Sequence, residues 1–204
     1  FLDDDAVAST GLTEQVAAAF AADERLGGVS FRLVDEDEHS EAILVPRPGG
    51  RDADRSGDVA VFLGGASAIR RSAYEEAGGF FGDLFYGHEE TELSWRLIDA
   101  GWSIRYLAEA TVFHPRIEIG RHPERWRMTG RNRVLVARRA LPWPIAIVHV
   151  SVWLVLGAIR AGRQRCLRGY VAGWMAGWRR PVDRSPISWR GVWRLTRLGR
   201  PPVL

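Results

Sequence analysis

The chain has 204 residues and 46% apolar side chains, enough for one or two domains with a real hydrophobic core. Its single cysteine, Cys166, excludes a disulfide framework and a cysteine-rich metal cluster. The net charge of +3 hides an asymmetry: residues 1–100 carry 8 arginines and 21 acidic residues, whereas residues 101–204 carry 20 arginines and 4 acidic residues. We therefore expect an acidic catalytic half and a basic half that meets something anionic.

The basic half points to a membrane surface more than to nucleic acid. Six of the nine tryptophans lie at or after Trp143, among arginines and long apolar runs, and this mixture is typical of a membrane interface. The sequence contains no helix-turn-helix, zinc-finger or RNA-binding motif. We expect a membrane surface as a partner and no nucleic acid.

The chain opens with an apolar pair, Phe1-Leu2, followed directly by the carboxylates Asp3, Asp4 and Asp5. This pattern predicts a buried parallel strand that reaches the surface at its carboxyl end, the edge where open α/β sheets bind ligands. Two aspartates one residue apart can hold a hard divalent cation, which in turn can hold a diphosphate. A strand of this kind is normally interior to a domain, so we expect the chain to begin partway through one.

The rest of the acidic half is predicted to combine helices with strands. Capping patterns at Thr13 and Ser72 predict two helices, and residues 35–57 predict a loop because they are rich in charge, glycine and proline. A third helix is expected over Glu89–Ala100, ended by Gly101, with an ion pair between Glu92 and Arg96. The predicted strands are Val29–Val34, Val59–Leu63, Ser103–Leu107 and Thr111–Phe113.

The basic half is predicted to be helical from about Trp126. Ala140–Ile159 is a run of twenty residues without a formal charge, about the length of a helix that crosses a bilayer. Prolines and mid-segment polar residues favour an interfacial or re-entrant helix, and a transmembrane span and a buried core helix are the alternatives. The tail from Arg179 holds four prolines and is expected to pack irregularly or to lie on a surface.

Two further groups are candidates for chemistry. Glu89 and Glu90 open the third predicted helix beside an aromatic, glycine-rich loop, where a carboxylate can act as a general base. Acids in a first helical turn are also ordinary helix chemistry, so both interpretations stay open. His114 ends a predicted strand, as the aspartates do, and is either a ligand at the same sheet edge or a structural histidine.

In combination, these segments resemble family 2 glycosyltransferases of the GT-A fold over about residues 1–115. The tail between Arg179 and Pro202 also resembles actinobacterial members. The segments that carry the resemblance, in chain order, are Phe1-Leu2-Asp3-Asp4-Asp5, Gly64-Gly65-Ala66-Ser67-Ala68-Ile69-Arg70-Arg71, Gly78-Gly79-Phe80, Glu89-Glu90-Thr91-Glu92-Leu93-Ser94-Trp95-Arg96, Gly101-Trp102 and Ala110-Thr111-Val112-Phe113-His114.

The resemblance implies a role for each matching residue. Asp3 and Asp5, with Asp4 between them, match the Asp-x-Asp motif that binds Mg²⁺ or Mn²⁺ on the donor diphosphate, and His114 matches a histidine that completes the metal shell in some members. Glu90 matches the catalytic base and Glu89 the first acid of the same motif. Gly64, Gly65 and Arg70 match the segment that shapes the acceptor and sugar pocket.

The sequence departs from the family pattern at three places. Glu90 stands where the family usually has an aspartate, and Phe81 stands where it usually has the aspartate of a Phe-Asp pair. The family's first half, with the pocket for the nucleotide base, has no counterpart before Asp3. We therefore expect residues 1–204 alone to be inactive.

The sequence thus predicts an α/β fold, with an incomplete GT-A domain over residues 1–115 and a mainly helical, apolar and basic extension over residues 116–204. The expected activity is inverting transfer of a sugar from a nucleotide-diphosphate donor to a cell-envelope glycan or lipid-linked acceptor, at the cytoplasmic face of the membrane. The alternatives are a metal-dependent nucleotidyl- or phosphotransferase, and a membrane-associated scaffold or degenerate transferase without catalysis.

Overall fold

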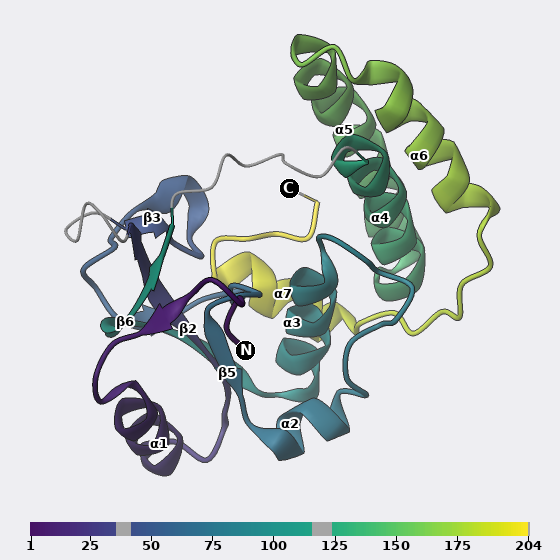
Figure 1. Ribbon diagram of the computed structural model, residues 1–204. Helices are drawn as coiled ribbons and strands as arrows, with labels where there is room; N and C mark the ends of the chain where they lie inside the picture. The colour runs from purple at the N-terminus through teal and green to yellow at the C-terminus, as the bar shows by residue number, and fades with distance from the viewer. Residues whose placement is uncertain (36–41, 116–123, 204) are drawn as a thin grey trace.

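The computed structural model describes residues 1–35, 42–115 and 124–203, and its centre is a mixed sheet of six strands (Figure 1). Two long strands, β2 (Leu26–Asp35) and β6 (Ser103–His114), run parallel side by side. All the other pairings are antiparallel. On its side away from β2, β6 pairs with β1 (Val7–Ala8) and β4 (Gly57–Asp58). On its side away from β6, β2 pairs with β3 (Ala42–Leu44) and β5 (Ser67–Ile69).

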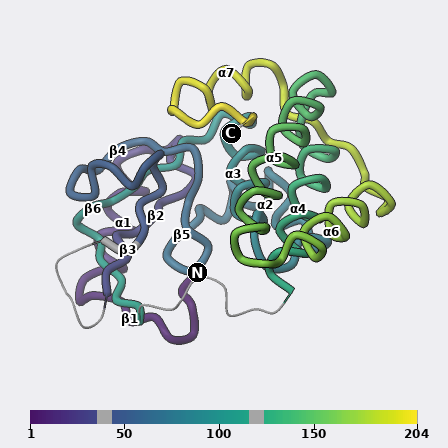
Figure 2. Tube along the Cα trace, turned by 90° about the horizontal axis from the view of Figure 1, so that it is seen from above, coloured from purple at the N-terminus to yellow at the C-terminus, as the bar shows by residue number. Residues whose placement is uncertain are grey.

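The helices cover both faces of the sheet, with α1 on one face and most of the others on the opposite face (Figure 1). Figures 1 and 2 both show α4, α5 and α6 side by side, away from the sheet, with α3 between them and the strands. The helices are α1 (Leu12–Ala22), α2 (Arg71–Glu76), α3 (Glu89–Ala100), α4 (Arg125–Ala140), α5 (Trp143–Arg163), α6 (Leu167–Arg179) and α7 (Trp189–Arg197), with a 3-10 turn at Pro48–Gly50.

Each face of the sheet has its own hydrophobic core. Under α1, Leu12 packs with Val29, Phe31 and Val112. The larger core on the other face joins residues of the sheet, α3, α4, α5 and α7, so the helical extension and the α/β part share it. The α/β class with a mainly helical extension is therefore confirmed. The division at residue 115 stays a prediction.

The expectation for the first two residues is wrong. Phe1 and Leu2 are 57% and 45% exposed and do not form a buried parallel strand. Leu2 makes an isolated antiparallel bridge with Ala66, and the Phe1 carbonyl accepts from the Ser67 amide at 3.1 Å. The reason is that this segment pairs with the turn before β5 and lies outside the β2–β6 pair.

Other strands differ in detail from the prediction. Val59–Leu63 is largely buried but forms no regular ladder, and the strand lies further on, at Ser67–Ile69. The two short strands predicted after residue 102 are one strand, β6, because its pairing with β2 continues across a register shift between Phe31 and Arg32. The region 35–57 contains β3, the 3-10 turn and the start of β4; residues 36–41 lie outside the described part.

The helix predictions hold better than the predicted caps. The helix over Glu89–Ala100 is confirmed, with Gly101 in the left-handed conformation at φ 104°. Neither Thr13 nor Ser72 caps its helix: α1 begins after Gly11, and α2 begins after Arg70. The tail, which was expected to be irregular, contains α7, whose Ser188 hydroxyl accepts from the Gly191 amide at 3.1 Å.

The long apolar segment is the helix α5. Among the described residues, it is the one helix that is long and apolar enough to cross a bilayer, with mean hydropathy 1.8 and 28% of its most apolar window buried. Its inner face packs through His149 and Val150 into the larger core. Length and composition alone do not separate a membrane helix from a core helix.

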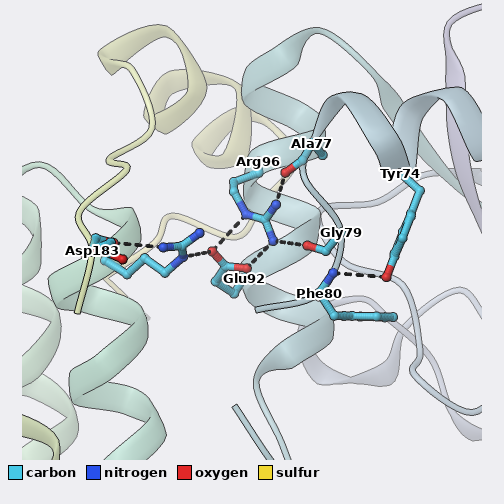
Figure 3. A network of polar contacts seen from close by, with 8 residues as sticks. Tyr74, Ala77, Gly79, Phe80, Glu92, Arg96 and Asp183 are labelled. Atoms are coloured by element: carbon cyan, nitrogen blue, oxygen red, sulfur yellow. Dashed lines mark hydrogen bonds and ion pairs between the residues drawn. The ribbon is translucent and has the colours of Figure 1, made fainter. Parts of the chain in front are cut away.

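A buried ion network connects the helices of the two halves (Figure 3). Glu92 on α3 is fully buried, and one of its oxygens accepts from Arg96 Nε at 2.9 Å and from Arg139 Nε of α4 at 3.0 Å. Arg96 also donates to the carbonyls of Ala77 and Gly79, and Arg139 donates to the carbonyl of Asp183 at 2.8 Å. One carboxylate therefore holds α3, the turn after α2, α4 and the C-terminal tail together.

Glu92→Gln should destabilise the protein by about 3–5 kcal/mol, because it leaves the buried guanidinium group of Arg96 and the partly buried one of Arg139 without a countercharge. The matched control is Glu75→Gln, which breaks the exposed 2.8 Å pair with Arg71 and should cost less than about 1 kcal/mol. Urea denaturation followed by circular dichroism measures both. Equal effects of the two substitutions would contradict a central role for Glu92.

Candidate metal and catalytic site

Asp5 reaches His114 because of the way β1 pairs. β1 runs antiparallel to β6, with Val7 opposite Phe113, so the chain before β1 passes the carboxyl end of β6. His114 is the last residue of that strand, and its Nε2 lies 3.1 Å from Asp5 Oδ1. The predicted convergence of these two side chains at one sheet edge is therefore present.

Asp3 completes the group and is held beside the turn that precedes β5. Its amide donates to the Gly65 carbonyl at 3.1 Å, and its Oδ2 lies 3.4 Å from His114 Nε2. A methyl group on Gly65 would lie only 2.1 Å from Asp3 Oδ2, so the carboxylate occupies the space that any larger residue at position 65 would need. Gly65 is thus required by the close approach of the Asp3 carboxylate, and its predicted part in shaping the acceptor and sugar pocket stays a prediction.

The three side chains fit a divalent cation. One ligand atom from each of Asp3, Asp5 and His114 lies within 4.8 Å of the others. Two ligands bound at right angles about 2.1 Å from one ion lie about 3.0 Å apart, close to the spacing found here. Two carboxylates and one imidazole suit Mn²⁺, and the 56% and 43% exposure of the aspartates leaves room for a diphosphate.

The hydrogen bonding of His114 strengthens this fit. Its Nδ1 lies 2.6 Å from the Pro115 carbonyl, which can only accept, so Nδ1 carries the proton. In the neutral ring, Nε2 is then a bare lone pair that faces two carboxylates. An imidazole lone pair and two carboxylates directed at one point suit a bound divalent cation.

Asp35 is a neighbour of this site that the sequence reading missed. It ends β2 directly opposite His114, and it is 5% exposed. The sequence reading assigned it to the start of a loop. The rule that the ends of adjacent parallel strands meet at one edge could have found it. Asp4, in contrast, is exposed and is not among the three converging ligands.

Glu90 lies in a separate cavity of about 450 Å³ beside the same turn. Leu63 lines this cavity and bridges to Ala66, next to Gly65, so one short turn connects the cavity wall to the Asp3 carboxylate. Glu90 touches solvent inside the cavity but is enclosed by protein on most sides. This burial, followed by the negative charge of Glu89, raises the pKa of Glu90 from 4.5 to about 7.

Two neighbours of Glu90 at the start of α3, Glu89 and His88, are also partly enclosed by protein. Glu89 has one buried carboxylate oxygen without a hydrogen-bond partner. His88 precedes the helix with φ 79°, and burial, followed by the charge of Arg133, holds its pKa well below 6.5. His88 is therefore neutral at pH 7, while Glu90 is close to half protonated.

Arg70 does not join this site, which corrects the sequence-based expectation. Its guanidinium donates to the carbonyls of Phe20, Asp23 and Leu26 at 2.7–3.0 Å and so caps the end of α1. Its amide bonds to Gly27 at the amino end of β2, roughly 26 Å along the strand from Asp35. Gly64 stands beside the site with open space around it, because no atom lies within 4 Å of a methyl group placed there.

The comparisons with known proteins give likenesses among solved structures alone. No family model matches the chain, and no curated protein does either. Among solved structures, the chain resembles mannosyltransferase PcManGT from Pyrobaculum calidifontis, in complex with GDP-Man and Mn²⁺, with 19% identity and a TM-score of 0.44. The match covers 97% of this chain, which spans about half (53%) of the other. Similarity at this level carries no activity over to this chain.

Gly65→Ala should weaken Mn²⁺ binding by about tenfold or more without unfolding the protein, because the new methyl group displaces the flexible Asp3 carboxylate from the other two ligands. Calorimetric titration with Mn²⁺ measures the affinity. Gly64→Ala is the matched control and should bind Mn²⁺ as the original chain does. If both variants bind Mn²⁺ normally, Asp3 is not a ligand.

Proposed function

We propose that this chain is part of a metal-dependent, inverting glycosyltransferase of family 2 and of actinobacterial type. It transfers a sugar from a nucleotide-diphosphate donor to the hydroxyl of a cell-envelope glycan or lipid-linked acceptor. The observation that carries the proposal is the convergence of Asp3, Asp5 and His114 at the carboxyl end of β6, joined through one turn to the cavity that holds Glu90. The proposed family rests on the resemblance carried by the order of motifs in the sequence.

Each of these residues has a defined task in the proposed reaction. Asp3, Asp5 and His114 would hold Mg²⁺ or Mn²⁺, which supplies charge for the leaving diphosphate. Glu90 takes the proton of the acceptor hydroxyl. At the same time the oxygen of that hydroxyl forms the new bond to the anomeric carbon, and the bond from this carbon to the diphosphate breaks. Attack from the face opposite the leaving group inverts the configuration.

The pKa of Glu90 supports its role as the base. A general base works best when its pKa lies near the working pH, and burial brings Glu90 to about 7. The longer side chain of glutamate, in place of the family's usual aspartate, is accommodated because α3 begins directly at Glu89 and the cavity lies over this first turn.

In the complete enzyme of which this chain is proposed to be part, Glu90→Gln should lower sugar transfer by roughly 10²-fold or more while binding of the sugar nucleotide survives, because the amide is nearly isosteric but cannot accept the proton. The rate of the unaltered protein should rise with pH through about 7, as Glu90 loses its proton, and the variant should lack this rise. Transfer to an added acceptor is followed with Mn²⁺ and a panel of sugar nucleotides.

Glu89→Gln is the control for this experiment. It removes the negative charge that helps to raise the pKa of Glu90, so the rise in rate should move to lower pH while transfer continues. The assignment fails if Glu89→Gln abolishes transfer and Glu90→Gln does not, because Glu89 would then be the base.

We further propose that the protein binds the cytoplasmic face of the membrane peripherally. The outer faces of α5 and α6 expose large apolar side chains, among them Ile147, Val155, Ile159, Leu167 and Met175. The inner face of α5 packs on the α/β part, with the His149 ring 6.0 Å from the Trp95 ring, which disfavours a helix surrounded by lipid. Arginines at the end of α5 and the start of α6 suit anionic headgroups.

The protein should float with vesicles that contain anionic lipid and should bind neutral vesicles more weakly. A carbonate or high-salt wash should then release it, because an interfacial helix leaves the bilayer when its charge attraction is removed. Retention after carbonate would indicate a transmembrane span. No flotation with either kind of vesicle would identify α5 as an ordinary core helix.

A further inference from the structure

A second cavity, of about 430 Å³, adjoins the first on the side of the helical extension. His88, Glu90, Arg133 and Trp153 line both cavities, so the two form one site with two arms. One arm leads past Leu63 toward the turn that holds Asp3. The other lies between the start of α3 and the helices α4, α5 and α6, where Arg160 lines it.

Two guanidinium groups in the second arm lie against one indole ring. Arg133 of α4 stacks over Trp153 with its central carbon 3.4 Å from the ring centroid, and Arg160 of α5 lies 5.3 Å from the same centroid. Stacking fixes the planes of both groups and leaves their N–H edges available. The Tyr170 hydroxyl donates to the backbone carbonyl of Trp153 at 2.5 Å and so ties the backbone of α5 at this position to α6.

The charges in this arm are not balanced by protein groups. Arg133 Nε is buried without a hydrogen-bond partner, and Glu90 is the one acidic residue among the described residues that line either cavity. Burial first, and then the like charges of Arg160 and Arg200, lower the pKa of Arg133 from 12.5 to about 9. The buried Arg133 donor without a partner is costly unless an acceptor binds there, and the exposed Arg160 adds a second positive charge beside it.

We infer that Arg133 and Arg160 bind a phosphate group of the acceptor, which places the acceptor hydroxyl at Glu90. Planar guanidinium groups match phosphate oxygens in geometry and charge. The donor diphosphate is assigned to the other arm, so this second anion site belongs to the acceptor. The inference rests on the proposed transfer reaction and narrows its acceptor to molecules that carry phosphate, whether on a lipid or on a sugar.

The test measures binding in the absence of divalent metal and sugar nucleotide, so it can fail independently of the transfer reaction. Calorimetry compares farnesyl phosphate with farnesol, and glucose 6-phosphate with glucose, on the folded chain. Either phosphate should bind at least about tenfold more tightly than its neutral partner. The phosphate compound that binds more tightly identifies a lipid or a sugar as the carrier. Equal binding of phosphate and neutral compounds overturns the inference.

Arg160→Gln should weaken phosphate binding by about 10- to 100-fold, because it removes a charged donor from the site. Arg163→Gln is the matched control: it removes an exposed arginine one turn further along α5 and should have little effect. Equal losses in the two variants would show a general attraction to a basic surface and overturn the assignment. Arg133→Gln should also lose binding, and if it fails to fold, the result for Arg160 decides.

Discussion

The buried carboxylate of Glu92 is the interaction on which the rest of the structure depends. It sits on the same short helix as Glu90, and its partner Arg139 sits on the same helix as Arg133. Because Glu92 is fully buried, its charge must be met by both guanidinium groups, and only one relative position of α3 and α4 achieves this. The network therefore fixes the position of Glu90 on α3 relative to Arg133 on α4.

The sequence predicted those parts of the fold whose signals are local. The helix over Glu89–Ala100 combines acids in its first turn with a glycine stop, and both signals act within the segment itself. The opening pair Phe1-Leu2 misled because its apolar character says nothing about its partner, which is a turn some sixty residues away. The pairing of Glu92 with Arg139 was equally unreadable, since helical spacing accounts only for Arg96.

The candidate site divides in the same way. The aspartates and His114 could be assigned because each borders a strand, and strand ends collect at one edge of a sheet. Arg70 was misplaced because a motif gives the order of residues and not the end of the strand at which they lie. Nothing in the sequence set Arg133 and Arg160 apart from the other arginines, because residues 101–204 contain twenty of them. They are distinguished only by the indole of Trp153, against which helix packing places both.

The charge asymmetry of the chain has a physical use in this arrangement. The acidic half supplies carboxylates that need a cation before they can hold a diphosphate, whereas the basic half supplies guanidinium groups that can hold phosphate directly. Glu90 lies between them, and its pKa is a balance in which burial raises it while Arg200 and Arg133 lower it. A phosphate bound to Arg133 offsets that positive charge, so it raises the proton affinity of Glu90. In the proposed reaction, the pKa of Glu90 would thus be higher with the acceptor bound than without it, which strengthens the base but also raises the pH needed to deprotonate it.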